Sequence, residues 1–194
     1  MMAAVMGTPS SLPQRLKQET RSLHARAERA GVMGALIGRR IERGAYCAML
    51  RNLHAIYEAL EAALDALPPT APVRTLWHDA LRRAPRLAED LDTLHGREWR
   101  RDLAIVAATQ GYVDRLRALG SASALAAHAY VRYLGDLNGG RILAALVREH
   151  LALGPGAGAA FYDFDTDSVA LRDHFRAALG ALNVLPADED AIVA

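Results

Sequence analysis

In the segment Tyr130-Val131-Arg132-Tyr133-Leu134-Gly135-Asp136-Leu137-Asn138-Gly139-Gly140-Arg141-Ile142-Leu143, three glycines interrupt a predicted helix. The flanking residues 122–129 and 142–150 are strong helix formers, and no turn signal separates them. Each glycine inside a helix costs about 1 kcal/mol relative to alanine. Gly135 and Gly139 are four residues apart and share one face, with Gly140 beside them. The sequence therefore predicts a strip of bare backbone next to one carboxylate, Asp136.

Two interpretations of this glycine strip are open. Small residues on a helix allow close packing against a second helix. They also allow a flat or bulky ligand to approach the main chain. The neighbouring Asp136, Arg132, Tyr130 and Tyr133 favour the ligand, because close packing alone does not require polar side chains at these positions.

The composition indicates a single all-α domain. The chain has 194 residues, enough to bury a full core, and only 6% are aromatic. The formal net charge of +1 gives no reason to expect nucleic acid as a partner. Cys47 is the one cysteine, which excludes an intramolecular disulfide and any site built from several cysteines. No export signal and no run of 18 apolar residues is present, so we expect a soluble, cytoplasmic protein without a membrane partner.

Periodicity and helix-breaking residues divide the chain into helices. Pro85 is expected either to kink the fourth of them or to open a new helix. We predict a flexible tail over residues 1–10 and one helical domain over 11–194, with a structured loop at 161–164. The predicted helices are 11–29, 32–37, 42–67, 71–94, 103–119, 121–153, 168–182 and a last one from Pro186.

The first helix carries a stripe of four chemically distinct side chains. Lys17, Arg21, His24 and Glu28 lie at i, i+4, i+7 and i+11, on one face. Seven residues separate Lys17 from His24 by about 10 Å, roughly the span from a porphyrin centre to its propionates. Imidazole is a good axial ligand for iron, and the cations suit two carboxylates. Glu28 is placed to orient the imidazole or to pair with Arg21. The alternative is an ordinary solvated face with a half-buried histidine.

A second pair of cations, Arg172 and Arg176, is spaced i, i+4 on the 168–182 helix. Two guanidiniums on one face bind carboxylates or phosphates well, although Arg172 could equally pair with Asp173 or Asp167. The other six histidines form no His-x-x-x-His or paired Glu-x-x-His pattern, so we expect them to be packing or surface residues. No phosphate-binding loop, nucleophile elbow or dinucleotide fingerprint is present.

Three segments together resemble the heme oxygenase family. Residues 127–140 are similar to its distal-helix signature, residues 17–28 to its proximal-helix motif, and residues 53–61 match in position and order. The similarity runs in collinear order from Ser11 to the end of the sequence. It implies a helical bundle that holds heme between a proximal helix and a kinked, glycine-rich distal helix.

The resemblance also implies a role for each matching residue. His24 would be the heme-iron ligand. Asp136 would order a proton-donating water, with Tyr57 and Arg132 in the same hydrogen-bond network. Gly135, Gly139 and Gly140 would let the distal helix kink and lie over the heme. The propionates would be held by Lys17, Arg21, Tyr130, Arg172 and Arg176, and position 21 is often lysine in the family.

The implied reaction is oxidative cleavage of heme b to biliverdin, carbon monoxide and ferrous iron, at the α meso carbon. Heme is then both substrate and prosthetic group, O2 is a co-substrate, and electrons come from a ferredoxin, a flavodoxin or a reductase. A biliverdin-using photoreceptor or reductase is the partner expected to take the product. Two alternatives remain: a heme carrier or sensor that does not degrade heme, and a heme-free helical enzyme acting on a small heterocycle. The second is poorly served by Cys47, which has no evident activating partner.

Overall fold

A computed structural model describes residues 11–154, 157–182 and 186–193, and within them the chain is helical without β-strands. Residues 1–10, predicted as a tail, and residues 155–156, 183–185 and 194 lie outside these ranges. The α-helices are α1 (Leu12–Glu19), α2 (Arg21–Arg29), α3 (Gly31–Ile37), α4 (Arg43–Asp65), α5 (Ala84–Leu94), α6 (Trp99–Asp102), α7 (Ala107–Ala118), α8 (Ala122–Ala129), α9 (Gly135–His150), α10 (Ser168–Gly180) and α11 (Pro186–Val193). Shorter helical turns are η1 (Pro72–Leu76), η2 (Asp79–Leu81), η3 (Tyr130–Leu134) and η4 (Ala160–Tyr162).

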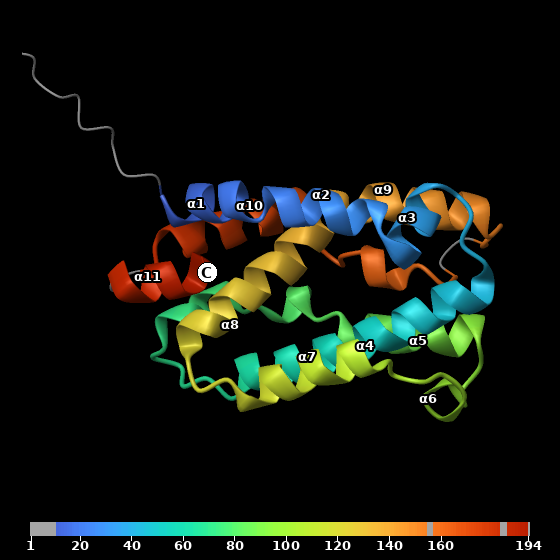
Figure 1. Ribbon diagram of the computed structural model, residues 1–194, viewed down its shortest axis with the longest axis horizontal. Coiled ribbons are helices and arrows are strands. Elements are labelled where there is room, and N and C mark those ends of the chain that lie inside the picture. Colours follow the sequence, from blue (N-terminus) through green and yellow to red (C-terminus); the bar gives the residue numbers. More distant parts are fainter. Residues whose placement is uncertain (1–10, 155–156, 183–185, 194) are drawn as a thin grey trace, which may run out of the picture.

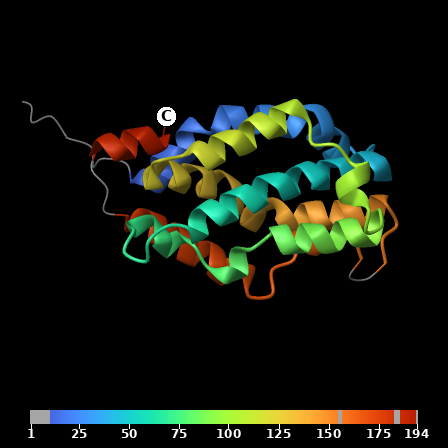
Figure 2. The ribbon, with the colours of Figure 1, turned by 90° about the horizontal axis from the view of Figure 1, so that it is seen from below.

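The helices form three layers around α4. Helices α1, α2 and α3 lie at the front of the molecule with α7 below them, and α5 and α10 lie at the back (Figure 1). Seen from below, α4 runs between α7 and α5, with α2 and α3 on the α7 side and α9 on the α5 side (Figure 2). None of the described helices is both long and apolar enough to span a membrane.

Helix α4 forms the centre of the core because apolar side chains surround it on most sides. Tyr46, Leu50 and Leu60 on this helix are completely inaccessible to solvent. Cys47 is also buried, and burial raises the pKa of its thiol. A buried, protonated thiol is a poor nucleophile. Cys47 is therefore a packing residue of the core.

The predicted helix over 71–94 is wrong in its first half. Residues 72–81 form two short 3₁₀ turns, η1 and η2, and an α-helix begins only at Ala84. The carboxylate of Glu61 accepts hydrogen bonds from the backbone N–H groups of Arg83 and Ala84, which satisfies donors at the helix start. Pro85 therefore opens a new helix, the second of the two expectations.

The predicted helix over 103–119 begins four residues late. Leu103 and Val106 are extended, and the amide side chain of Asn52 accepts the backbone N–H of Val106. Trp99–Asp102 forms the short helix α6 just before this extended segment. The remaining helices agree with the predicted ranges within a few residues, except that Thr20 separates the first one into α1 and α2.

The glycine-bearing helix bends just before its glycines, and the glycines themselves are not part of the bend. Residues 130–134 of η3 form a π-helical turn, and α8 and α9 leave it in different directions (Figure 1). Gly135, Gly139 and Gly140 follow it in regular α-helix. Because a π-turn inserts an extra residue into the helical ladder, it bends the helix and sets Asp136 at the start of α9.

Candidate functional site

Asp136 and Tyr57 form a hydrogen-bonded pair between α9 and α4. Asp136 lies in the first turn of α9, and the Tyr57 hydroxyl donates to its Oδ2. Tyr57 is 1% exposed, and its ring packs between those of Tyr133 and Phe161 at centroid distances of 5.7 and 5.6 Å. The phenol has little room to move. The sequence-predicted network around Asp136 therefore includes Tyr57 through a direct contact.

Burial and nearby charges determine the ionisation of this pair. Burial raises the pKa of Asp136 to about 6, although the Tyr57 hydrogen bond and the charges of Arg132 and Arg83 act to lower it. Burial, followed by the charge of Asp136, raises the pKa of Tyr57 well above its ordinary value. Tyr57 thus stays protonated and donating, while the carboxyl group of Asp136 changes its charge close to neutral pH.

Arg132 lies one helical turn before Asp136 and acts on the pair through its charge. Burial works to lower the pKa of Arg132, but the phenol of Tyr57 and the carboxylate of Asp136 more than compensate and raise it. Its buried Nε has no hydrogen-bond partner among the described residues. The guanidinium therefore acts on Asp136 through its charge and forms no direct ion pair with it in the described structure.

The three glycines of α9 divide into two kinds. A Cβ atom built on Gly135 or Gly139 meets no atom within 4 Å, so both face open space. A Cβ on Gly140 would lie 3.6 Å from the carbonyl oxygen of Tyr162 in η4. Gly140 packs against η4 at a distance that the Cβ of an alanine would also tolerate, whereas a Cβ on Gly135 or Gly139 would meet no atom of the described structure within 4 Å.

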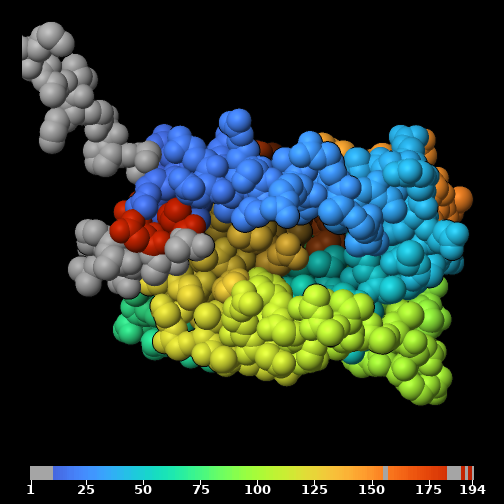
Figure 3. Space-filling model, viewed as in Figure 1, coloured from blue at the N-terminus to red at the C-terminus, as the bar shows by residue number. Residues whose placement is uncertain are grey.

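His24 lies on the most exposed helix of the fold. Helix α2 has no buried residue, and its one leucine, Leu23, is 60% exposed. The imidazole of His24 is 67% exposed, and its Nδ1 lies 3.8 Å from Oε1 of Glu28. Glu28 is the carboxylate beside this ring, at a distance too long for a hydrogen bond. On the front face, α2 and α3 border a recess above α7 (Figure 3).

The predicted cation groups differ in what they contact. Arg176 donates to the Oδ1 of Asn138 on α9 at 3.2 Å, which brings it to the helix of the glycines. Arg172 instead pairs with Asp173 at 3.0 Å, one of the two alternatives raised by the sequence. Lys17 and Arg21 are exposed. Among the described residues, no side-chain hydrogen bond or ion pair joins Lys17, Arg21 or Tyr130 to the Asp136 group.

No sequence pattern indicated Arg83, and Tyr133, which the sequence placed beside the glycine strip, was assigned no role in the site. Arg83 is 2% exposed, and Tyr133 is 0% exposed with a hydroxyl that has no partner in the described structure. The position of Tyr133 next to Arg132 was the signal that could have indicated its role. Arg83 follows Arg82 in the sequence, and no pattern distinguishes it from its neighbour. His128, expected to pack or face solvent, bonds the hydroxyl of Tyr112 through Nδ1 at 2.8 Å.

One hollow on the described surface, of about 480 Å³, lies along α2 and is lined by Leu23, Arg26, Ala27, Arg29 and Ala30. Another, of about 500 Å³, lies between the ends of α4, α7 and α8 and is lined mainly by alanine and leucine, with Glu58 and Arg117. Neither hollow is lined by a predicted site residue. The candidate site therefore rests on the Asp136–Tyr57 pair and the open glycines of α9, and not on a hollow.

Comparison with known proteins identifies the family. The sequence profile of heme oxygenases matches residues 10–194. The chain belongs to the heme oxygenase family. A curated relative, heme oxygenase 2 of the cyanobacterium Synechocystis, is 34% identical over 190 residues, which are 94% of this chain and 75% of that protein. The predicted family resemblance and the all-α fold are both confirmed.

Solved heme oxygenases have the same fold. The structure from Leptospira interrogans superposes with a TM-score of 0.90 at 32% identity and covers 95% of this chain and 92% of that one. Heme oxygenase-2 of Synechocystis, solved in complex with heme and NO, has a TM-score of 0.90 at 33% identity and covers 95% and 78%. The chain is accordingly a heme oxygenase in fold and in enzyme class, an oxidoreductase that degrades heme.

Proposed function

We propose that this heme oxygenase cleaves heme to biliverdin, carbon monoxide and ferrous iron, and that the reaction takes place between α2 and α9. The observation that carries the proposal is the Tyr57–Asp136 pair in the first turn of α9, next to the uncovered backbone of Gly135 and Gly139. A helix that only packs against its neighbours has no need of both features.

The residues present fit a heme. Gly135 and Gly139 leave room for a flat ring against the α9 backbone, and His24 on α2 presents an imidazole that no other group covers. A neutral imidazole is an axial ligand for heme iron. Cationic side chains on α1, α2 and α10 suit two propionates, through bidentate or charge-assisted hydrogen bonds. They are Lys17, Arg21, Arg172 and Arg176, with Tyr130 as a further hydrogen-bond donor.

Bound heme supplies the iron that activates O2 and is itself the substrate, whose ring opens at a meso carbon. The protein's contribution is to control protons and space. The carboxylate of Asp136 accepts hydrogen bonds, so it can hold a water on the open side of α9 and direct its protons toward the reacting edge. Tyr57 fixes the orientation of that carboxylate, and the charge of Arg132 favours its ionised form. The backbone at Gly135 and Gly139 would limit the space over one edge of the ring, and the family resemblance implies cleavage at the α meso carbon.

Electrons come from a separate donor, and we propose a ferredoxin, flavodoxin or reductase with an acidic docking surface. Arg26 and Arg29 are exposed on α2 close to the proposed iron ligand. Arg15, another cation near this helix, is committed to Glu189 and Asp190 of α11 and is not available in the same way. A photoreceptor or reductase that uses biliverdin is the partner expected to take the product.

The test is a single-turnover experiment with hemin. Hemin added to the purified protein should give a shifted Soret band, and a reductant in air should convert it to the broad red absorbance of biliverdin with release of carbon monoxide. Analysis of the product isomers then tests the α position. A stable ferrous spectrum under the same conditions would identify a heme carrier or sensor and refute the proposal.

A further inference from the structure

Arg83 carries a fully buried charge that no carboxylate neutralises by a direct hydrogen bond in the described structure. Its guanidinium donates to four backbone carbonyls instead: Ala80 at 3.0 Å, Leu81 at 3.3 Å, Phe161 at 3.1 Å and Asp163 at 2.7 Å. It also lies over the ring of Phe164 at 4.0 Å. Desolvating a cation is costly, so a buried arginine bound only to carbonyls is expected where its charge has a use.

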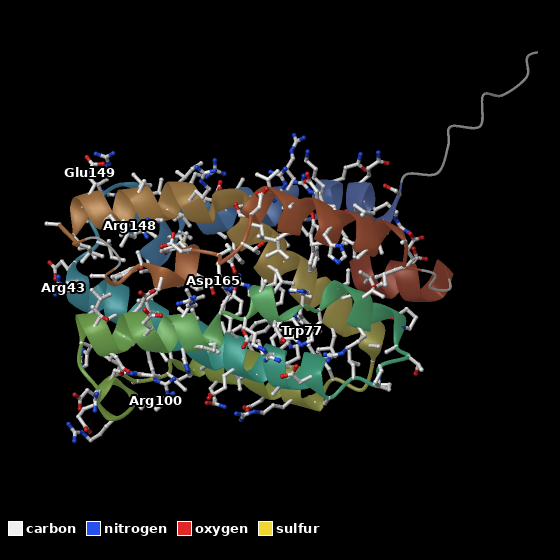
Figure 4. All side chains as sticks on the ribbon, turned by 180° about the vertical axis from the view of Figure 1, so that it is seen from behind. Arg43, Trp77, Arg100, Arg148, Glu149 and Asp165 are labelled. Carbon is white, nitrogen blue, oxygen red and sulfur yellow. The ribbon has the colours of Figure 1, made fainter. Side chains whose placement is uncertain are left out.

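Two of these hydrogen bonds, to Phe161 and Asp163, tie η4 and the residue after it to the start of α5. Asp90 on α5 holds the same turn from its other side, because its two carboxylate oxygens accept the backbone N–H groups of Ala160 and Phe161 at 2.7 and 2.8 Å. Beyond η4, Asp165 pairs with Arg86 of α5 and is labelled on the back face in Figure 4. The η4 segment is thus fixed at several points against one helix.

This fixed turn supports the catalytic pair directly. The ring of Phe161 packs edge-on against the ring of Tyr57, at 5.6 Å between centroids. The carbonyl of the next residue, Tyr162, closes the space behind Gly140 on α9. Hence Arg83 holds Phe161, Phe161 confines Tyr57, and Tyr57 bonds Asp136.

The charge of Arg83 also acts on Asp136. Arg83 acts to lower the pKa of Asp136, and Asp136 acts to raise the pKa of Arg83. Glu61, another carboxylate whose charge acts on Arg83, already accepts hydrogen bonds from two backbone N–H groups. The titratable and charged groups that surround Asp136 come from four elements. They are Tyr57 on α4, Arg132 and Tyr133 on η3, Arg83 before α5, and Tyr162 on η4.

We propose that Arg83 is a positioning residue for heme cleavage: its guanidinium fixes η4 behind Tyr57 and adds a buried positive charge to the surroundings of Asp136. The relevance to catalysis rests on the proposed role of Asp136. The coupling itself is a property of the protein without heme, so it can be tested independently of that role.

The test is a pH titration of the Asp136 carboxyl carbon by ¹³C NMR in hemin-free protein, with the resonance assigned by its loss in Asp136→Asn. Wild-type protein should titrate near pH 6. Arg83→Lys keeps the charge and should titrate close to wild type. Arg83→Gln keeps hydrogen-bond donors but not the charge, and its midpoint should rise by about 1 pH unit. The matched control is Arg82→Gln, because Arg82 pairs with Asp65 and is not among the charges that act on Asp136.

Equal midpoints in Arg83→Lys and Arg83→Gln would overturn the proposal, as would an equal shift in Arg82→Gln. A second measurement does not require the Arg83→Gln variant, so it remains valid if that variant fails to fold. In wild-type protein the Nε–H resonance of Arg83 should shift with the midpoint of Asp136, and in Asp136→Asn it should not. An Arg83 resonance that is insensitive to pH between 4 and 8 in wild-type protein contradicts the coupling.

Discussion

Opposing influences set the charge of Asp136. Burial favours the neutral acid, whereas the Tyr57 hydroxyl and the charges of Arg132 and Arg83 favour the carboxylate, and the pKa settles at about 6. A group with this pKa is mostly ionised at neutral pH but can still accept a proton at low cost. That balance distinguishes Asp136 from the surface carboxylates of this chain, such as Asp165, whose pKa lies below its ordinary value because of Arg86.

Replacing Asp136 with alanine should separate binding from catalysis. Hemin should still bind, because Asp136 contributes no iron ligand and no cation. The rate of biliverdin formation should fall by about 100-fold, the usual loss when a general acid–base group is removed. Single-turnover absorbance spectra measure both. Asp114→Ala, which removes an exposed carboxylate from α7, is the control and should react like wild type. A normal biliverdin yield from Asp136→Ala contradicts the assignment.

The raised pKa of Asp136 also predicts how stability depends on pH. The folded-state pKa of about 6 exceeds the unfolded value of about 3.9, so the carboxyl group favours folding below pH 4 and this contribution is lost as the pH rises through 6. Relative to Asp136→Asn, the free energy of unfolding of wild-type protein should fall by about 2–3 kcal/mol between pH 4 and pH 8. Urea denaturation at several pH values measures it. A difference that rises with pH would mean that the pKa is depressed.

At the scale of the helices, the site consists of two surfaces that the rest of the protein leaves uncovered, one on α2 and one on α9. Helix α2 buries none of its residues, although its sequence carries apolar positions. Helix α9 is well packed at Gly140 but open at Gly135 and Gly139. An exposed leucine on α2 and an uncovered backbone on α9 are both unfavourable alone, so a ligand between them would remove both deficits.

Alanine at Gly139 should make the protein more stable and less able to bind hemin. The added Cβ meets no neighbour, so helix propensity should raise the free energy of unfolding by up to about 1 kcal/mol. The same methyl group would intrude on the heme face and should weaken hemin binding by tenfold or more, typical of overpacking. Gly111→Ala on α7, where the space is also open, should give the stability gain alone. Unchanged hemin affinity in Gly139→Ala would place heme elsewhere.

Hemin should protect α2 from hydrogen exchange more than any other helix. Amides of a helix without buried side chains exchange through low-energy local opening, whereas α4 opens only with the whole core. Exchange followed by mass spectrometry should therefore show slowed exchange at 21–29 on adding hemin and little change at 43–65. Protection confined to the α4–α7–α8 hollow would instead assign heme to that cavity.

For the whole molecule, the sequence predicted the helical bundle, the length of α4, the glycine-bearing helix and the Asp136–Tyr57 partnership. These features depend on local periodicity or on motifs with residues at fixed spacing. It failed at 72–81 and 103–106, where side chains from α4 decide the backbone. Glu61 and Asn52 capture N–H groups from segments far away in the sequence, and helix propensity gives no sign of such contacts.

The role of Arg83 could not be predicted for the same reason, because it also depends on contacts between segments far apart in the sequence. Its importance depends on the carbonyls of Phe161 in η4 and of Asp163 just after it, which are 78 and 80 residues away. No spacing rule connects them, and an arginine beside another arginine ordinarily indicates a solvated surface. The π-turn η3 was equally invisible, because the glycines that drew attention to the segment lie in regular helix just after it.

The most direct test of heme binding between α2 and α9 is the spectrum of the hemin complex of His24→Ala, recorded with and without added imidazole. We predict that the variant folds normally, since the His24 side chain is largely exposed, but that it loses the wild-type Soret band and biliverdin formation. Imidazole should restore the band by filling the space left by the side chain. A His24→Ala complex with the wild-type spectrum and turnover would show that another residue binds the iron.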